Sequence, residues 1–454
     1  MPNEHNDFIN EPPATNGSRP GKKTNNMKPT TILAVFCLLM GAVFVPTALA
    51  QDATSSSGSE SGFFSRSQLT GNWGGSRDWL DAHGVTIEMN GIYTLQSIVE
   101  GGANRGDQTG NLFSGDLSLK LDTSKAGLWP GGFLSTRVEG RAGDSVLRRA
   151  GATSPVNNDA LAPLVPGKFG DNTWALTELV AMQFLSEQFG LMGGLINTTS
   201  GDANPIAGSL ISNAHFFNTG FLYSPVELAE IPTVTPGGGV IFLPTQNIQG
   251  SLIVVGSTET AGENPFDGYD GTTFSSEWTF KYQLGQLPGG MTIGGLYSIN
   301  QSRSPLTEDP RILIQDVLAG NSIKTNKDSW AVYWNGFQYI QGDEKRGWGV
   351  FGRFGVSDGD PNPIAWSMAA GIGGVGLLPV RDKDRWGVGI YHLQYTNKGL
   401  IDDLGIDHET GGEVFYNMEF TPWMHVTLDA QVVDSAIPGV DMAFVLGSRV
   451  AISF

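Results

Sequence analysis

The sequence predicts an all-β protein, a transmembrane antiparallel β-barrel of about 16 strands with a short N-terminal helix and long extracellular loops. Three observations predict this fold. Apolar and polar residues alternate along many segments, the connections between these segments alternate between short and long, and the chain ends on a strand whose last residue is Phe454. In that last strand Phe444 and Leu446 share one face, and Arg449 lies on the other.

Residues 1–50 are predicted to be an N-terminal lead followed by a secretory signal peptide. The nearly apolar run 32–45 follows several lysines and leads to a small-residue site at 48–50, which predicts cleavage before Gln51. The long polar lead makes Met27 a possible true start. The apolar run is shorter than the roughly 20 residues that a membrane-spanning helix needs.

Composition excludes several function classes. The net charge of −18 argues against nucleic-acid binding, because phosphate contacts dominate that affinity. The only cysteine, Cys37, lies in the signal peptide, so no disulfide or cysteine metal ligand is expected in the mature chain. Residues 51–68 are Ser- and Gly-rich and predicted to be flexible, and 69–454 are predicted to form one barrel. Length alone also fits two or three soluble domains.

The predicted elements begin with one helix, from Ser76 as N-cap to His83, with Asp78 in its first turn and Gly84 as its stop. Sixteen candidate strands follow, and an even number is usual for bacterial single-chain barrels. The candidate strands begin near Val85, Asn111, Gly132, Leu176, Phe189, Gly238, Ile248, Thr273, Gly290, Ser329, Arg346, Pro363, Arg385, Gly411, Trp423 and Asp441.

The lengths of the connections provide the stronger argument for a membrane barrel. In such barrels short turns face the periplasm and long loops face outside, whereas a soluble sandwich has no reason to sort its loops in this way. The short connections are 186–188, 285–288 and 421–422, and the long ones are 142–175, 198–237, 258–272, 301–328 and 397–410. The connections that depart from the alternation are 374–384, 357–362 and 434–440.

The two faces of the predicted strands suit two different solvents. Phe274, Trp278 and Phe280 share one face of their strand, and Glu277 and Lys281 lie on the other. Charged residues that point away from lipid imply a wet interior, since a barrel of about sixteen strands leaves an aqueous channel. Tryptophans near the strand ends match the aromatic girdles of membrane proteins. They are Trp330, Trp334, Trp348, Trp366, Trp386 and Trp423.

Four blocks of the sequence resemble the carbohydrate-selective porin family, the OprB-like porins. The first is the entry motif LTGNWGGSR at 69–77, and the others lie at 212–219, 346–354 and 413–431. The resemblance covers roughly 69–454. Two departures are Asn72, where many relatives carry Asp, and His215-Phe216, which replaces a smaller pair.

The resemblance implies a sixteen-strand barrel of the bacterial outer membrane that admits mono- or oligosaccharides by passive diffusion and carries no cofactor. Phe454 then resembles the outer-membrane assembly signal. Outer-membrane lipids are expected partners, and the oligomeric state, monomer or trimer, stays open. One alternative is a general porin without sugar preference. The other is a secreted all-β protein that binds or hydrolyses carbohydrates, in which short and long loops would follow each other in no particular order.

Strand alternation predicts a set of charged residues that line the pore. Sugar hydroxyls accept hydrogen bonds from guanidinium groups and donate them to carboxylates, and rings of charge set selectivity in channels. The alternative is a self-neutralising ladder that only solvates the lumen. The pore-lining candidates are Arg137, Glu139, Arg141, Glu277, Lys281, Arg353 and Arg449.

Two long loops supply the candidates for a constriction. The loop at 142–175 contains Trp174, and the loop at 198–237 contains His215, Phe216 and Phe217. Surface loops rarely carry so many aromatic residues, so the second loop is expected to pack, for example in the barrel mouth. Its aromatic rings either stack on sugars or fill the space between loop and barrel.

Nothing in the sequence predicts catalysis or a metal site. The acidic segments 267–271 and 358–360 lack the spacing and closing Glu of an EF-hand loop, so acidic turns are the preferred interpretation. The chain has no HExxH motif. Scattered carboxylates permit a glycosidase pair, whose geometry a sequence does not define. We therefore predict that the protein is not an enzyme.

Overall fold

The structure is a computed structural model that describes residues 62–454 except 104–107, 166–171, 267–269, 304, 309 and 320–324. The predicted signal peptide, its cleavage before Gln51, the alternative start at Met27 and most of the predicted flexible segment lie outside the described residues. So does part of the acidic segment 267–271.

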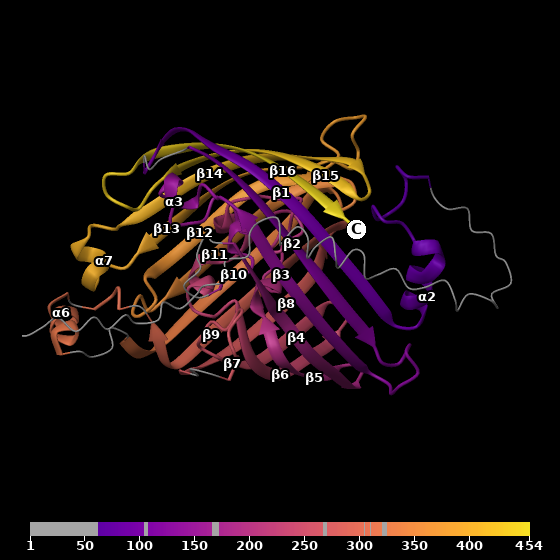
Figure 1. Cartoon of the computed structure of the whole chain (residues 1–454), viewed down its shortest axis with the longest axis horizontal. Helices are drawn as coiled ribbons and strands as arrows, with labels where there is room; N and C mark the ends of the chain where they lie inside the picture. The colour runs from indigo at the N-terminus through magenta and orange to yellow at the C-terminus, as the bar shows by residue number, and fades with distance from the viewer. Residues whose placement is uncertain are drawn as a thin grey trace, which may run out of the picture. The chain divides into compact units, whose positions relative to one another are not determined.

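Sixteen antiparallel strands form a closed barrel in which each strand pairs with the next and β16 pairs with β1 (Figure 1). Every strand begins within four residues of its predicted start, because the alternation of apolar and polar residues marks strands directly. The strands are β1 (Val85–Gly102), β2 (Thr109–Asp122), β3 (Gly132–Gly143), β4 (Thr173–Ser186), β5 (Phe189–Asn197), β6 (Val234–Thr245), β7 (Ile248–Gly256), β8 (Thr272–Leu284), β9 (Leu287–Arg303), β10 (Thr325–Gly342), β11 (Gly347–Ser357), β12 (Ile364–Val375), β13 (Arg385–Tyr395), β14 (His408–Thr421), β15 (Met424–Asp434) and β16 (Asp441–Ser453).

The predicted helix is present as α2 (Ser76–Ala82), which precedes β1, but its N-cap residue is Gly75 and not Ser76, and no side chain caps its N-terminus. Further helices that the sequence did not predict lie mostly in the long loops. Among the described residues no helix is long and apolar enough to cross a membrane. The remaining helices are η1 (Trp73–Gly75), α3 (Leu147–Ala150), η2 (Asn158–Leu161), η3 (Thr198–Ser200), α4 (Thr219–Leu222), α5 (Pro225–Leu228), α6 (Pro310–Ala319) and α7 (Gly399–Asp403).

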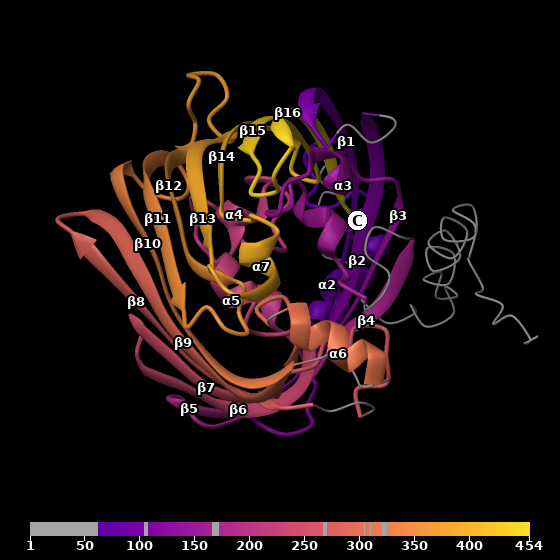
Figure 2. The ribbon, with the colours of Figure 1, turned by 90° about the vertical axis from the view of Figure 1, so that its left-hand side faces the viewer.

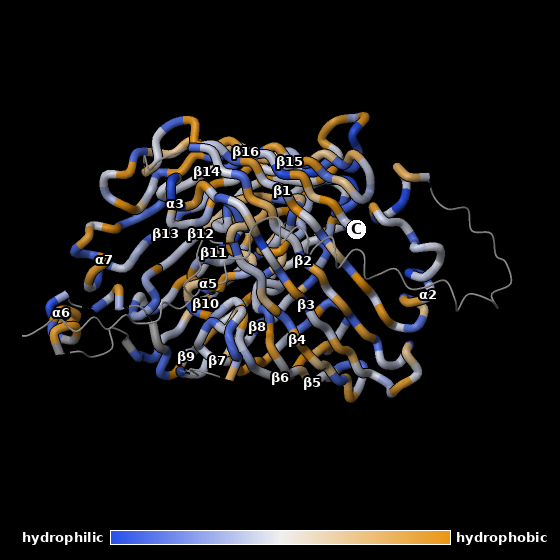
Figure 3. The backbone as a smooth tube through the Cα atoms, viewed as in Figure 1, coloured by the Kyte–Doolittle hydropathy of each residue, from blue (hydrophilic) through white to orange (hydrophobic). Residues whose placement is uncertain are grey.

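The outer surface of the barrel is apolar. Along the last strand Phe444 is 41% exposed, whereas its neighbours Ala443 and Val445 are buried, so alternate side chains face outward. Hydrophobic and hydrophilic residues alternate along the strands (Figure 3). Apolar residues that are exposed in this way recur around the barrel, as a lipid-facing surface requires. They include Tyr93, Leu119, Leu134, Leu179, Leu252, Phe274, Ile293, Val332, Phe354, Met368, Val388, Val414 and Leu428.

The connections are sorted by length, as predicted. The short turns and the chain's C-terminus lie at one end of the barrel with α2, and the long loops with α6 and α7 lie at the other end (Figure 1). The N-terminal motif is tied to the C-terminus at the short-turn end. The Arg77 guanidinium donates to the Phe454 carbonyl (3.0 Å), and the Leu69 N–H donates to the Ser453 carbonyl (2.8 Å).

The β5–β6 loop (198–233) folds into the barrel, where α4 and α5 lie inside the ring of strands on the side of β10–β14 (Figure 2). Its aromatic residues pack against inward-facing aromatics of these strands in one buried cluster. Phe216 stacks on Phe221 with ring centroids 4.4 Å apart, and it meets Phe415 of β14 edge-on at 4.7 Å. This packing leaves the opposite side of the interior, along β2–β8, as the space available to solutes.

Candidate functional site

Arg353 of β11 anchors the β5–β6 loop. Its guanidinium forms an ion pair with Asp202 and donates to the carbonyl of Phe221 (2.9 Å). The side chain faces the barrel interior, as strand alternation predicted, but it is only 3% exposed under the loop. The structure therefore does not place Arg353 on the open channel, where the sequence prediction had put it.

Arg449 of β16 holds the β3–β4 loop (144–172) in the same way. Its Nε lies 3.0 Å from Asp159, and its Nη2 donates to Asn158 (2.5 Å). The guanidinium carbon also lies 3.7 Å from the centroid of the Phe217 ring, a cation–π contact that ties the β5–β6 loop to the same arginine. Arg449 is 0% exposed. It faces inward as predicted but does not contact the open channel, because the loop covers it.

Two carboxylates of β14 complete the loop anchoring, and the sequence analysis missed both. Glu413 accepts the backbone N–H groups of Phe217 (2.6 Å) and Asn218 (2.9 Å). Glu409 accepts the N–H of Ser154 (2.8 Å) and the hydroxyl of Thr153 (2.7 Å). Buried backbone N–H groups need such acceptors. Alternation along β14 places both side chains inward, but their loop partners depend on the tertiary fold.

The predicted ladder on β3 is largely self-neutralised. Arg137 lies 3.1 Å from Asp116 of β2 and 3.5 Å from Glu139. Arg141 is 2% exposed and donates to the Pro163 carbonyl of the inward β3–β4 loop. Arg137, whose side chain is 15% exposed, is the member of the ladder with most access to solvent. The arrangement fits the alternative in which the ladder solvates the lumen.

The residues named for the predicted loop constriction lie in different surroundings in the structure. Trp174 belongs to β4 and is 59% exposed, and its neighbours Thr173 and Ala175 are buried, so it faces outward at the long-loop end. Phe216 and Phe217 are 0% exposed in the interior. They fill the space between loop and barrel, which is the second of the two roles considered for these rings.

His215 is partly exposed beside this aromatic cluster. Its Nε2 lies 3.5 Å from a guanidinium nitrogen of Arg385 in β13. Burial, together with the positive charge of Arg385, lowers the pKa of His215 to about 3. His215 is therefore neutral at physiological pH and acts as a packing residue of the loop.

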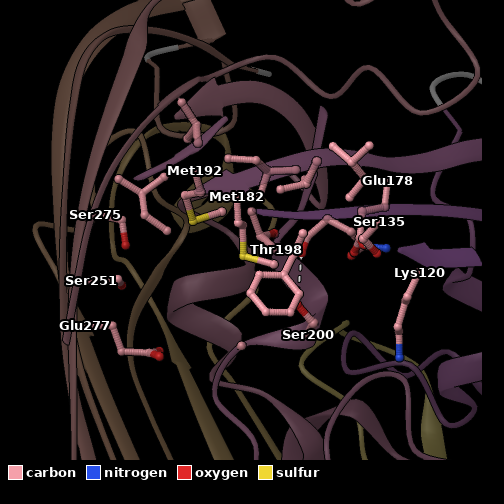
Figure 4. Close-up of a pocket in the computed structure, with 18 of the residues that line it drawn as sticks. Lys120, Ser135, Glu178, Met182, Met192, Thr198, Ser200, Ser251, Ser275 and Glu277 are labelled. Carbon is pink, nitrogen blue, oxygen red and sulfur yellow. Dashed lines mark hydrogen bonds between the residues drawn. The ribbon is translucent and has the colours of Figure 1, made fainter. Parts of the chain in front are cut away.

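An interior cavity of about 540 Å³, named the main cavity because it lies beside the inward loop, separates the β5–β6 loop from the strands on the opposite side. Its lining combines carboxylates, hydroxyl groups and aliphatic or sulfur-containing side chains. Figure 4 shows Met182 and Met192 side by side, with Glu277 and Ser275 to one side and Glu178 to the other. Further lining residues are Lys120, Ser135, Val180, Ile196, Thr198, Ser200, Tyr223, Glu227, Ser251, Ile253, Val255 and Tyr333.

Hydroxyl groups hold the carboxylates of this cavity in place. Ser135 donates to Glu178, and Tyr333 donates to Glu277 (2.7 Å). In the loop, the Tyr223 hydroxyl donates to Glu227 (2.7 Å). Burial, reinforced by the negative charges of Asp202 and Glu277, raises the pKa of Glu227 well above the ordinary value of a glutamate. Glu277 was among the predicted pore residues, and it does reach the cavity.

Lys281, four residues along β8, lies nearer the short-turn end. It lines a separate cavity of about 630 Å³ together with Asp343, Glu344 and Lys345 of the β10–β11 turn. Of the seven predicted pore-lining residues, Glu277 and Lys281 thus line cavities.

Three cavity residues escaped the sequence analysis for identifiable reasons. Glu178 lies at a β-bulge of β4. Arg137 pairs with Glu178, but the next residue of β3, Val138, pairs with Leu176. Strand β4 therefore holds one extra residue here, which reverses its alternation of inward and outward side chains. Met182 and Met192 face inward although they are apolar. A binary pattern assigns such residues to the lipid face, so only the bulge and the strand register identify them.

The described residues contain no group of three or more His, Cys, Asp or Glu side chains that would hold a metal ion. In the predicted acidic turn at 358–360, Asp360 accepts from Lys327 (3.1 Å) and Thr307 (2.7 Å). These protein donors satisfy its carboxylate, as expected of an acidic turn.

A closed sixteen-strand barrel with a lipid-suited exterior and a water-accessible interior narrowed by inward loops defines a porin, a diffusion channel of the bacterial outer membrane. The sequence matches the family described as "Carbohydrate-selective porin, OprB family" over residues 110–454, and the chain belongs to that family. The protein is an outer-membrane carbohydrate channel, and the loop order and apolar exterior exclude the secreted alternative.

Solved structures agree with this fold. The high-pH structure of Pseudomonas putida OprB has a TM-score of 0.72 at 20% identity, over 89% of this chain and 100% of that chain. The low-pH structure of the same protein has a TM-score of 0.54 at 17% identity, over 86% of this chain and 99% of that chain. No curated protein sequence matches this chain.

Proposed function

We propose that carbohydrates cross the barrel through the main cavity, between the inward β5–β6 loop and the strands β3–β8. The observation that supports this path is the mixed lining of the cavity. Met182, Met192 and Ile253 offer an apolar surface to the C–H face of a sugar ring, and Glu178 and Glu277 accept hydrogen bonds from its hydroxyls. A polar solute without an apolar face gains only the hydrogen bonds to these carboxylates.

In this proposal the polar and charged groups of the pore wall replace part of the water that hydrates the solute as it crosses. Arg137, beside Asp116 and Glu139, is the guanidinium candidate for further hydroxyl contacts because its side chain keeps 15% of its surface exposed. We assign the chain a passive channel role without catalysis. Arg141, Arg353 and Arg449 act on solutes indirectly, because they fix the loops that narrow the channel.

The test is liposome swelling with a six-carbon ring sugar and with an open-chain polyol of the same carbon number. We expect the ring sugar to enter faster, and Met182→Ser with Met192→Ser to reduce that preference. Glu187→Gln, at the exposed β4–β5 turn, is the control that should change nothing. Equal entry of sugars, polyols and amino acids of similar size in the unmodified protein would support a general porin instead.

A further inference from the structure

The β12–β13 connection (376–384) is an ordered hairpin at the short-turn end, where most connections are tight. Gly376 donates its N–H to the Asp384 carbonyl (2.9 Å), and Arg381 donates its N–H to the Leu378 carbonyl (3.0 Å). This connection departs from the predicted order of short and long loops. Its tip is apolar and exposed, with Leu377 at 53%, Leu378 at 46% and Val380 at 89%.

Side-chain contacts fix the hairpin on the outer face of the barrel. Arg381 holds the Asp384 carboxylate with two hydrogen bonds of 2.7 and 2.8 Å. The same carboxylate accepts from the Tyr416 hydroxyl of β14 (2.8 Å), and Tyr416 alternates with the buried Phe415 and Asn417, so it faces outward. The Arg381 guanidinium also lies 5.8 Å from the centroid of the Phe420 ring. The hairpin therefore leans over the outside of the barrel, not over its mouth.

Figure 2 shows this direction, since an orange loop beside β12 and β14 stands clear of the barrel's outer surface. The outer surface of the barrel beside this loop faces lipid, since Ile372 is 41%, Val388 44% and Phe420 55% exposed. The apolar tip thus continues the membrane-facing surface at the periplasmic end of the barrel.

We propose that the hairpin 376–384 is a lipid-binding element that inserts its tip into the periplasmic leaflet of the outer membrane. Apolar side chains beside charged ones match the boundary between acyl chains and head groups. Leu377, Leu378 and Val380 enter the acyl region, while Arg381 and Lys383 keep their charged ends at head-group level, as long basic side chains do. The clamp formed by Arg381, Asp384 and Tyr416 preorganises the hairpin, so little ordering accompanies lipid contact.

The experiment uses a probe on a single thiol in the full chain. In a Cys37→Ser background, Val380→Cys is labelled with an environment-sensitive fluorophore and reconstituted into phospholipid vesicles, whose two leaflets are alike so that orientation does not matter. We expect blue-shifted emission, loss of fluorescence with spin-labelled lipid, and little loss with an aqueous quencher. Glu187→Cys, on the exposed β4–β5 turn, is the matched control and should show the opposite pattern.

A probe at Val380 that behaves like the probe at Glu187 overturns the proposal. Protection from both quenchers, with disulfide-linked dimers of the unlabelled Val380→Cys chain, also overturns it and indicates that a second copy covers the tip. Leu378→Asp, with the probe at Leu377→Cys, is expected to lose the lipid signal. Sugar entry measured in the same vesicles shows whether the barrel is folded in each variant.

Discussion

At the residue scale, the inward-facing arginines show that a charged side chain on the inner face of a strand either lines the channel or anchors a loop. A sequence pattern does not distinguish these two roles. Arg353 and Arg449 are buried in ion pairs with Asp202 and Asp159 of the two inward loops, whereas Lys120 pairs with Glu88 in water. Removing one member of a buried pair leaves a charge without solvent or partner, which is far more costly than removing one member of an exposed pair.

Arg353→Met should therefore destabilise the barrel by about 3–5 kcal/mol, because Asp202 loses its buried partner. Urea unfolding in detergent or vesicles measures this change. Lys120→Met removes a positive charge whose side chain is 53% exposed and should cost at most about 1 kcal/mol. Similar costs for the two variants would contradict the anchoring role of Arg353. We also expect larger and noisier single-channel currents in Arg353→Met, since the loop is freed.

His215 gives a prediction for the dependence of stability on pH. Its pKa is about 3 in the folded chain, because burial and Arg385 disfavour the imidazolium, against an ordinary value of 6.5. Between these values the unfolded chain binds the proton and the folded chain does not, so stability increases with pH across this window and is lost as pH falls through it.

We expect the urea midpoint of the protein to fall between pH 7 and pH 4, and to fall less in His215→Gln, which carries no proton in either state. The difference between the two proteins isolates His215 from the many carboxylates. An identical decrease in both would show that the loop tolerates a charged His215.

At the scale of elements, strand β13 illustrates how glycine makes room for the inward loop. A Cβ atom on Gly389 would lie 2.7 Å from the Phe221 ring, and one on Gly387 would lie 2.6 Å from the Phe415 ring. Both contacts are too close for carbon atoms. Part of the high glycine content thus serves the packing of α4 against the inside of the barrel.

Gly389→Ala should displace the Phe221 side chain and destabilise the folded protein by about 1–3 kcal/mol, because the added methyl group overpacks a closely packed interior. The neighbouring strand offers a control in Gly412→Ala, since its Cβ would meet no atom closer than 3.5 Å. Thermal unfolding compares the two, and Gly389→Ala should also alter single-channel conductance through the shifted loop. Equal effects would mean that the loop repacks freely.

The barrel was predictable from sequence to a greater extent than the channel. Period-two alternation is a local property, so strands, their order and the inward direction of Arg353 follow from it. What covers Arg353 depends on a loop more than a hundred residues earlier in the chain, and no local pattern specifies that contact. Trp174 and Phe216 show the same limit, because both are aromatic loop candidates yet one faces outward and the other is buried.

At the scale of the whole molecule, ion pairing determines the charge that a solute meets. The inward arginines are engaged with Asp116, Asp159 and Asp202, so they do not offset the acidic groups of the main cavity. Those groups outnumber the basic ones. Glu227 is left out of this comparison because its raised pKa favours the uncharged form. The other carboxyl groups of the lining are those of Asp81, Asp122, Glu178 and Glu277, and the ammonium groups are those of Lys120 and Lys125.

The channel should therefore favour cations over anions. In planar bilayers under a KCl gradient, the reversal potential is expected to show that K⁺ permeates about tenfold more readily than Cl⁻, at the lower end of the counter-ion enrichment that a charged cleft produces. Glu178→Gln with Glu277→Gln should reduce this ratio, and Glu187→Gln at the exposed turn should not. Because salt screens such fields over about 10 Å at 0.1 M, the ratio should fall as salt rises.

The same negative charge should make a sugar acid enter more slowly than a neutral sugar of equal size. A preference for anions would instead mean that Arg137 faces the solute more freely than its ion pairs indicate.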